Sequence, residues 1–204
     1  NLVLGTLRNV TFQYEYLYVD QQGESNARNA LLELATESHI LFLDDDDMLS
    51  SNLLSTLYRA RSNSSVIAAN VFRFGQGISC GPNYVGNFID STTVREFTSL
   101  VKCRKLLSSA CAKLIPRQVI QQNRFATDLK IGEDSYFMVC ISPFIKKVDI
   151  HDECVYYVNH RSDSTSREHE HFSERGPRIF RLICKLTRLL FVKNPKYDRP
   201  FILT

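Results

Sequence analysis

The sequence lacks several features that define large classes of proteins. No apolar run approaches the roughly 18 residues of a membrane-spanning helix, and no G-x-x-x-x-G-K-[ST] phosphate loop is present. The six cysteines are scattered without a CxxC pair, so small buried thiols are a better interpretation than disulfides or a zinc site. The 25 Lys and Arg against 22 Asp and Glu leave a net charge of only +3, too balanced for a general nucleic-acid binder.

The sequence also lacks a starting methionine, a signal peptide within residues 1–30 and an internal repeat. The length of 204 residues and the hydrophobic content of 44% are typical of one globular domain, or of one domain with an appendage. We expect residues 1–170 to form a domain that is incomplete at its N-terminus, and residues 171–204 to form a separate tail.

Strands alternate with helices along the chain, which favours an α/β fold with a mainly parallel sheet. Strands are predicted at residues 14–19, 39–43, 66–74, 147–150 and 154–158. Helices are predicted at residues 26–37, 50–61, 94–107, 116–122 and 132–139, and a long loop at 75–92.

The acidic run from Asp44 to Asp47 follows a short apolar segment, residues 39–43, that reads as a buried strand. Four adjacent like charges repel one another unless a positive charge lies among them. In open α/β sheets ligands bind beyond the carboxyl ends of strands, and Mg²⁺ or Mn²⁺ prefers carboxylate and phosphate oxygens. The run therefore suits a metal that holds a diphosphate, and a solvated acidic turn is the alternative.

Two further clusters are informative only in combination with this run. Glu133 and Asp134 stand at a helix start, where a carboxylate either caps the helix or acts as a general base. Arg28 stands in the first turn of a helix after Gly23, a position that can face an anion.

Taken in order, these motifs resemble the family 2 glycosyltransferases of the GT-A fold. The stretch from Gly23 to Asn29 is similar to the family's Gly-x-Ser-x-Ala-Arg-Asn helix start, and FLDDDDML to its Asp-x-Asp motif. Lys113-Leu114, the pair Glu133-Asp134 and the late segment YYVNHRSDSTS follow at matching intervals. The resemblance covers about residues 14–170.

The resemblance implies a metal-dependent inverting transfer of a sugar from a nucleotide-diphosphate donor, such as a UDP-sugar, to a hydroxyl of a glycan or lipid-linked acceptor. It implies that Asp134 is the catalytic base and that Glu133 positions the acceptor. It also implies Mn²⁺ or Mg²⁺ as cofactor, held by Asp46 and Asp44 with His160. The residues implied in nucleotide-sugar binding are Arg28, Asp44, Asp45, Asp46 and Lys113.

The sequence departs from the family at its beginning. Family members open with a nucleotide-binding strand–helix–strand unit, and only nineteen residues precede Asp20. A non-catalytic remnant, or a module of the same fold that binds a divalent metal or glycan, is therefore the alternative to an enzyme.

The tail is a basic amphipathic segment. Residues 174–199 contain eight Lys or Arg and two acids, with leucines and isoleucines at helical spacing. A helix docked on the domain and a helix attached to a membrane surface both fit this pattern. With a surface-polysaccharide function in view, we expect a cytoplasmic protein at the inner face of the membrane.

Overall fold

The computed structural model describes residues 12–75, 77, 79–160, 172–191 and 197–203. Its centre is a seven-stranded sheet in the order β1-β6-β3-β7-β2, with β4 beside β3 and β5 beside β7. The strands are β1 (His39–Leu41), β2 (Met48–Leu49), β3 (Ser65–Phe74), β4 (Gly81–Pro82), β5 (Glu96–Phe97), β6 (Lys113–Pro116) and β7 (Lys147–Asn159).

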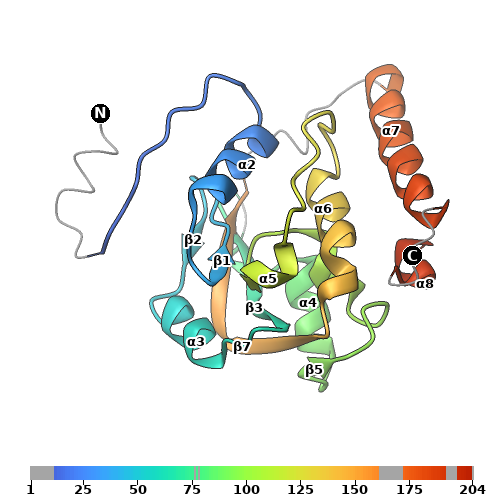
Figure 1. Ribbon diagram of the computed structural model, residues 1–204. Helices are drawn as coiled ribbons and strands as arrows, with labels where there is room; N and C mark the ends of the chain where they lie inside the picture. Colours follow the sequence, from blue (N-terminus) through green and yellow to red (C-terminus); the bar gives the residue numbers. More distant parts are fainter. Residues whose placement is uncertain (1–11, 76, 78, 161–171, 192–196, 204) are drawn as a thin grey trace.

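The sheet is mixed, although the sequence favoured a mainly parallel one. Its long central pair, β3 and β7, is parallel, whereas the five shorter pairs are antiparallel. The two strands predicted at residues 147–150 and 154–158 form the single strand β7, with a register shift opposite Ala69 and Asn70. The predicted α/β class is confirmed, because helices flank this sheet (Figure 1).

The helices of the described residues account for most of the predicted helical segments. They are α2 (Glu24–Leu34), α3 (Leu53–Ala60), α4 (Tyr84–Ser91), α5 (Arg117–Ile120), α6 (Glu133–Ile141), α7 (Phe172–Phe191) and α8 (Arg199–Leu203), with 3₁₀ turns η1 (Arg104–Ser108) and η2 (Ser142–Phe144). The helix predicted at residues 94–107 is wrong, because this segment contains β5 and η1.

The long loop predicted at residues 75–92 is also wrong, since it contains β4 and α4. The cause is a helix cap: the side-chain oxygen of Asn83 accepts hydrogen bonds from the backbone N–H groups of Val85 and Gly86. A Cβ atom on Gly86 would lie 2.3 Å from the carbonyl oxygen of Val71, so only glycine allows α4 to approach β3 this closely.

The N-terminal segment forms no strand where residues 14–19 predicted one. Its aromatic side chains are exposed, with Tyr18 at 76%, and no strand of the sheet pairs with it. Figure 1 shows it as an extended trace that leads away from α2. An aromatic and β-branched pattern favours a strand only where a sheet edge and a packing surface are available.

Helix α7 lies along one side of the molecule, next to α6 (Figure 1). Leu186, Leu189 and Leu190 pack against the hydrophobic core, and Leu182 contacts the turn at Gly132. No helix among the described residues is long and apolar enough to cross a membrane. The boundary predicted between residues 170 and 171 lies outside the described residues.

Candidate active site

The acidic loop after β1 is attached to the end of β7. The hydroxyl of Tyr156 accepts the backbone N–H of Asp44 at 3.2 Å and is hydrogen bonded to the carboxylate of Asp47. Asp47 also accepts the backbone N–H of Asn159 at 2.8 Å. Burial raises the pKa of Asp47 above its ordinary value, despite these donors. The loop is therefore held in place although its four aspartates repel one another.

Arg28 is the cation that lies among these carboxylates. Its Nη2 donates to Oδ1 of Asp44 at 2.7 Å, and its Nη1 donates to Oδ1 of Asp134 at 2.8 Å. Glu24, one helical turn earlier, is 3.5 Å from Nη1, and the ring of Phe125 lies under the guanidinium at 5.5 Å. Burial alone would lower the pKa of Arg28, but the carboxylates of Asp134 and Asp44 outweigh it and raise that pKa.

The position of Arg28 follows from the way α2 is attached to the core. The side chain of Asn29 accepts the N–H of Phe125 and donates to its carbonyl oxygen, at 2.8 and 2.9 Å. Phe125 stacks on Phe137 of α6, with ring centroids 4.0 Å apart. This pair of hydrogen bonds ties α2 to the segment before α6, so Arg28 is directed towards the start of that helix.

Asp134 lies in the first turn of α6 and is largely enclosed. Oδ2 accepts the hydroxyl of Ser109 at 3.0 Å and the N–H of Ala110 at 3.1 Å, while Oδ1 accepts Arg28. A carboxylate has about four lone-pair sites, so these three donors leave room for one more. Burial raises the pKa of the neighbouring Glu133.

The segment that contributes these donors, residues 109–113, contains an unusual backbone. Ala112 has φ of 61°, in the left-handed region that residues with a Cβ rarely adopt. The thiol of Cys111 donates to Oδ2 of Asp44 at 3.6 Å, and burial raises its pKa to about 12, so this thiol is protonated at neutral pH. The segment therefore contacts both Asp44 and Asp134.

Lys113 is enclosed beneath this segment. The residue is only 2% exposed, and its Nζ donates to the carbonyl oxygen of Cys111 at 2.9 Å. Burial lowers the pKa of this ammonium group from 10.5 to about 8. In the structure Lys113 thus holds the backbone at Cys111, whereas the resemblance implied a contact with the nucleotide sugar.

The structure brings Arg28, Asp44 and Asp134 into direct contact, although 106 residues separate the first from the last. Asp45 is exposed and Asp46 is half-buried on the same loop. His160 follows β7, and its backbone N–H donates to the carbonyl oxygen of Phe74 at 2.6 Å. Residues 161–166 of the late segment lie outside the described residues.

Sequence reasoning missed four residues of the site. They are Ser109, Cys111, Phe125 and Tyr156. Nothing local marks them: Tyr156 is one aromatic residue in a strand, and Ser109 precedes an ordinary apolar run. Their roles depend on contacts between distant segments.

The side chains of the site provide only part of what a hard divalent cation needs as ligands. Within the described residues no three His, Cys, Asp or Glu side chains form a group that could hold a metal. Asp44 is already engaged by Arg28 and Cys111. Some Mg²⁺ and Mn²⁺ sites do not need such a group. They use one or two carboxylates, and phosphate oxygens and water complete the coordination shell. Asp46 fits that mode of binding.

An acidic loop after a strand and an acid at a helix start are the features that the resemblance implies for glycosyltransferases of the GT-A fold. The structure adds that Arg28 joins the two. Comparisons with known proteins give glycosyltransferases among the similar proteins. No protein-family model matches the chain. The minor teichoic acid biosynthesis protein GgaB of Bacillus subtilis (strain 168) is 28% identical over 148 residues, which cover 71% of this chain and 16% of GgaB.

Two further proteins are similar. The glycosyltransferase GlyA of Streptococcus pneumoniae serotype 4 is 26% identical over 168 residues, or 76% of this chain and 24% of GlyA. The crystal structure of S. aureus TarS 1–349 in complex with UDP-GlcNAc matches with a TM-score of 0.71 and 17% identity, over 96% of this chain and 55% of that chain. The predicted resemblance to glycosyltransferases is confirmed, and the chain spans less than a quarter of the length of either curated relative.

Proposed function

We propose that this chain is the catalytic part of an inverting glycosyltransferase that acts in the synthesis of a cell-wall or surface glycan. The observation that carries the proposal is the contact of Arg28 with both Asp44 and Asp134. It joins the loop suited to a donor diphosphate to the carboxylate suited to an acceptor hydroxyl. The similarity to GgaB, which is named for teichoic acid biosynthesis, supports the glycan class.

The donor in this proposal is a UDP-sugar, bound beside the acidic loop. The similarity of the fold to TarS, solved with UDP-GlcNAc, supports a uridine nucleotide. Asp46, with Asp44, would hold Mn²⁺ or Mg²⁺, and the ion would supply neutralisation of the charge that develops on the departing nucleoside diphosphate. Arg28 supplies a fixed positive charge between Asp44 and Asp134 that limits the repulsion between the loop and an incoming diphosphate.

Asp134 would act as the general base. The acceptor oxygen forms a bond to the anomeric carbon of the donor sugar while the bond from that carbon to the diphosphate oxygen breaks. The hydroxyl proton passes to the carboxylate of Asp134 at its remaining lone-pair site. Ser109, Ala110 and Arg28 fix the carboxylate for this transfer. Attack opposite the leaving group inverts the configuration.

The replacement Asp134→Asn tests this assignment. Asparagine keeps the size of the side chain and removes the proton acceptor, so we expect kcat to fall by roughly 10²–10⁴-fold with UDP-sugar binding retained. The measurement is release of UDP from a panel of UDP-sugars with a cell-wall glycan acceptor. Asp152→Asn is the matched control, because Asp152 is an exposed partner of Arg95 and lies outside the site.

Two results would contradict parts of the proposal. Near-normal turnover by Asp134→Asn would show that Asp134 is not the general base. Metal binding without nucleotide binding or turnover in the unchanged protein would instead favour the non-catalytic module of the same fold.

A further inference from the structure

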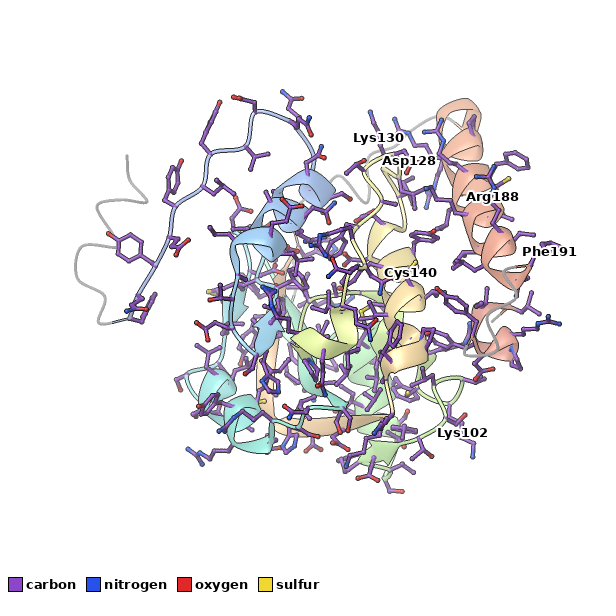
Figure 2. All side chains as sticks on the ribbon, in the orientation of Figure 1. Lys102, Asp128, Lys130, Cys140, Arg188 and Phe191 are labelled. Atoms are coloured by element: carbon purple, nitrogen blue, oxygen red, sulfur yellow. The ribbon has the colours of Figure 1, made fainter. Side chains whose placement is uncertain are left out.

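Helix α7 has one face that is packed and one that is not. Leu186, Leu189 and Leu190 pack on the core, and Leu182 covers the turn at Gly132. Away from this contact, Phe180, Ile183 and Phe191 are 67%, 53% and 80% exposed. Their spacing of three and eight residues places them on one side of the helix. Figure 2 shows Phe191 directed away from the body of the protein.

A neighbouring flank of α7 is strongly basic. Between positions 175 and 191 the sequence has five Lys or Arg and no Asp or Glu. Arg175, Arg181 and Arg188 are exposed. Exposed apolar side chains next to a row of cations on one helix are typical of helices that lie at a membrane surface.

A cavity beside α7 adds one cation, Lys130, from another segment of the chain. It has a volume of about 220 Å³ and lies between residues 128–130 and the first turns of the helix. Lys130, Arg178 and Arg181 line it, together with Asp128, Leu129 and Pro177. The carboxylate of Asp128 is 3.0 Å from the ammonium of Lys185, which offsets its charge. Arg181 also donates to the carbonyl oxygen of Asp128 at 3.0 Å. Three cationic side chains and one carboxylate line the cavity, and this charge balance favours a phosphate group as the occupant.

We propose that the outer side of α7, together with this cavity, docks on the surface of an anionic lipid bilayer. Phe180, Ile183 and Phe191 enter the boundary between headgroups and acyl chains, while the arginines and Lys130 contact lipid phosphates. A second copy of the chain fits this surface less well, because pairing two α7 helices would bring two rows of like charge together. The inference is independent of the proposed transferase activity.

The test is co-sedimentation of the full chain with sucrose-loaded vesicles at low ionic strength. We expect binding to vesicles of phosphatidylcholine with about a third phosphatidylglycerol, weak binding to pure phosphatidylcholine, and release by salt, since the attraction is screened within a Debye length. The combined replacement Phe180→Ser, Ile183→Ser and Phe191→Ser should weaken binding at least about tenfold, because it removes the inserted apolar area.

Two further variants separate the contributions of charge and apolar area. Arg178→Gln with Arg188→Gln should reduce binding to the anionic vesicles and leave binding to pure phosphatidylcholine unchanged. The control Leu54→Ser with Tyr58→Ser removes similarly exposed apolar side chains from α3, at the far end of the molecule from α7 (Figure 1). Far-ultraviolet circular dichroism of every variant verifies the fold.

The proposal is overturned if the protein does not bind anionic vesicles, or if the α3 control weakens binding as much as the α7 variant does. It is also overturned if light scattering shows a dimer that the α7 variant converts to a monomer while vesicle binding stays the same, because the surface then belongs to a second copy.

Discussion

At the scale of single residues, Arg28 determines the electrostatics of the site. It is the buried side chain that contacts Glu24, Asp44 and Asp134 together. Removing one member of such a buried cluster leaves the others without compensation, which costs far more than the loss of an exposed ion pair. Any change at Arg28 is therefore expected to affect stability as well as activity. Asp134→Asn also removes one charge of this cluster, so its free energy of unfolding is measured together with its kcat.

Lys113 gives a prediction about pH. Its pKa is about 8 in the folded protein and 10.5 ordinarily, so between these values the unfolded chain binds more protons than the folded one. The free energy of unfolding should therefore gain about 3 kcal/mol from this group as the pH rises from 8 to 10.5, and nothing from it below pH 8. Urea unfolding of the natural protein and Lys113→Met, at several pH values, measures the difference.

The free energy of unfolding of Lys113→Met must be subtracted from that of the natural protein at each pH, because buried thiols titrate in the same pH range. Burial raises the pKa of Cys103 and of Cys111 to about 12, so these groups make the free energy of unfolding fall as the pH rises above 9. Equal pH slopes for both proteins would show that Lys113 does not titrate with a lowered pKa.

The sequence predicted the centre of this site and missed its surroundings. Arg28, Asp44 and Asp134 each stand in a short motif, so the sequence identified them as candidates. Their direct contact with one another was found only in the structure. Tyr156 and Cys111 stand in no motif, and they reach Asp44 only because β7 and the segment before β6 pass beside the acidic loop. Contacts of this kind depend on the register of the whole sheet, which short patterns do not encode.

At the scale of elements, the turn before α6 connects the site to α7. Gly132 precedes Glu133 and Asp134 with φ of 76°, a left-handed conformation that glycine adopts without strain. A Cβ atom there would lie 2.4 Å from Cδ2 of Leu182. The backbone conformation that begins α6 and the packing of α7 on it therefore both depend on one glycine.

Gly132→Ala should lower the free energy of unfolding by about 1–3 kcal/mol, through backbone strain and the clash with Leu182. Leu182→Ala in the same chain should recover the part due to the clash, which a double-mutant cycle in urea isolates. Gly176→Ala is the control, because nothing lies within 4 Å of a Cβ atom at Gly176. If the Gly132→Ala protein were as stable as the natural one, the prediction would be wrong, and Leu182 would have to move aside at little cost in free energy.

Elements with strong local signals were predicted best. The strand at residues 66–74 and the helix at 132–139 correspond closely to β3 and α6, because an apolar run or an acidic helix start identifies each one. Residues 94–107 were predicted as one α-helix but fold into β5 and η1. Phe97 fills the core from the strand and Leu106 from the 3₁₀ turn. Tertiary packing overrode local preference there.

At the scale of the whole molecule, ligand binding should appear as a change in thermal stability. If UDP and Mn²⁺ bind only the folded chain, concentrations near one hundred times Kd add about 2.7 kcal/mol to the free energy of unfolding. That corresponds to a rise in Tm of roughly 5–10 °C for a chain of this size. Differential scanning fluorimetry with UDP, with Mn²⁺, with both, and after chelation by EDTA measures it.

The variant Asp46→Ala tests where the metal acts. It should abolish the increase due to Mn²⁺ and UDP together, while Asp152→Asn keeps it. If Asp46→Ala responded like the natural protein, the metal would not be held at the acidic loop.

The α/β class could be predicted from the alternation of strands and helices, but the mixed sheet could not. Pairing direction is set by which strands become neighbours, and β6 lies between β1 and β3 although it follows both by many residues. The structural similarity to TarS shows that a solved protein has the same fold.

The position of β1 at the end of the strand order also affects the behaviour of the protein in concentrated solution. Among the described strands β1 pairs with β6 alone, so its outer edge presents unpaired backbone groups to other extended chains. His39, Ile40 and Leu41 include no Lys, Asp or Glu to discourage such pairing, and three exposed tyrosines stand in the extended segment before α2. Ordered self-association through strand addition is therefore the hazard to expect on concentration, and it begins at a strand only three residues long.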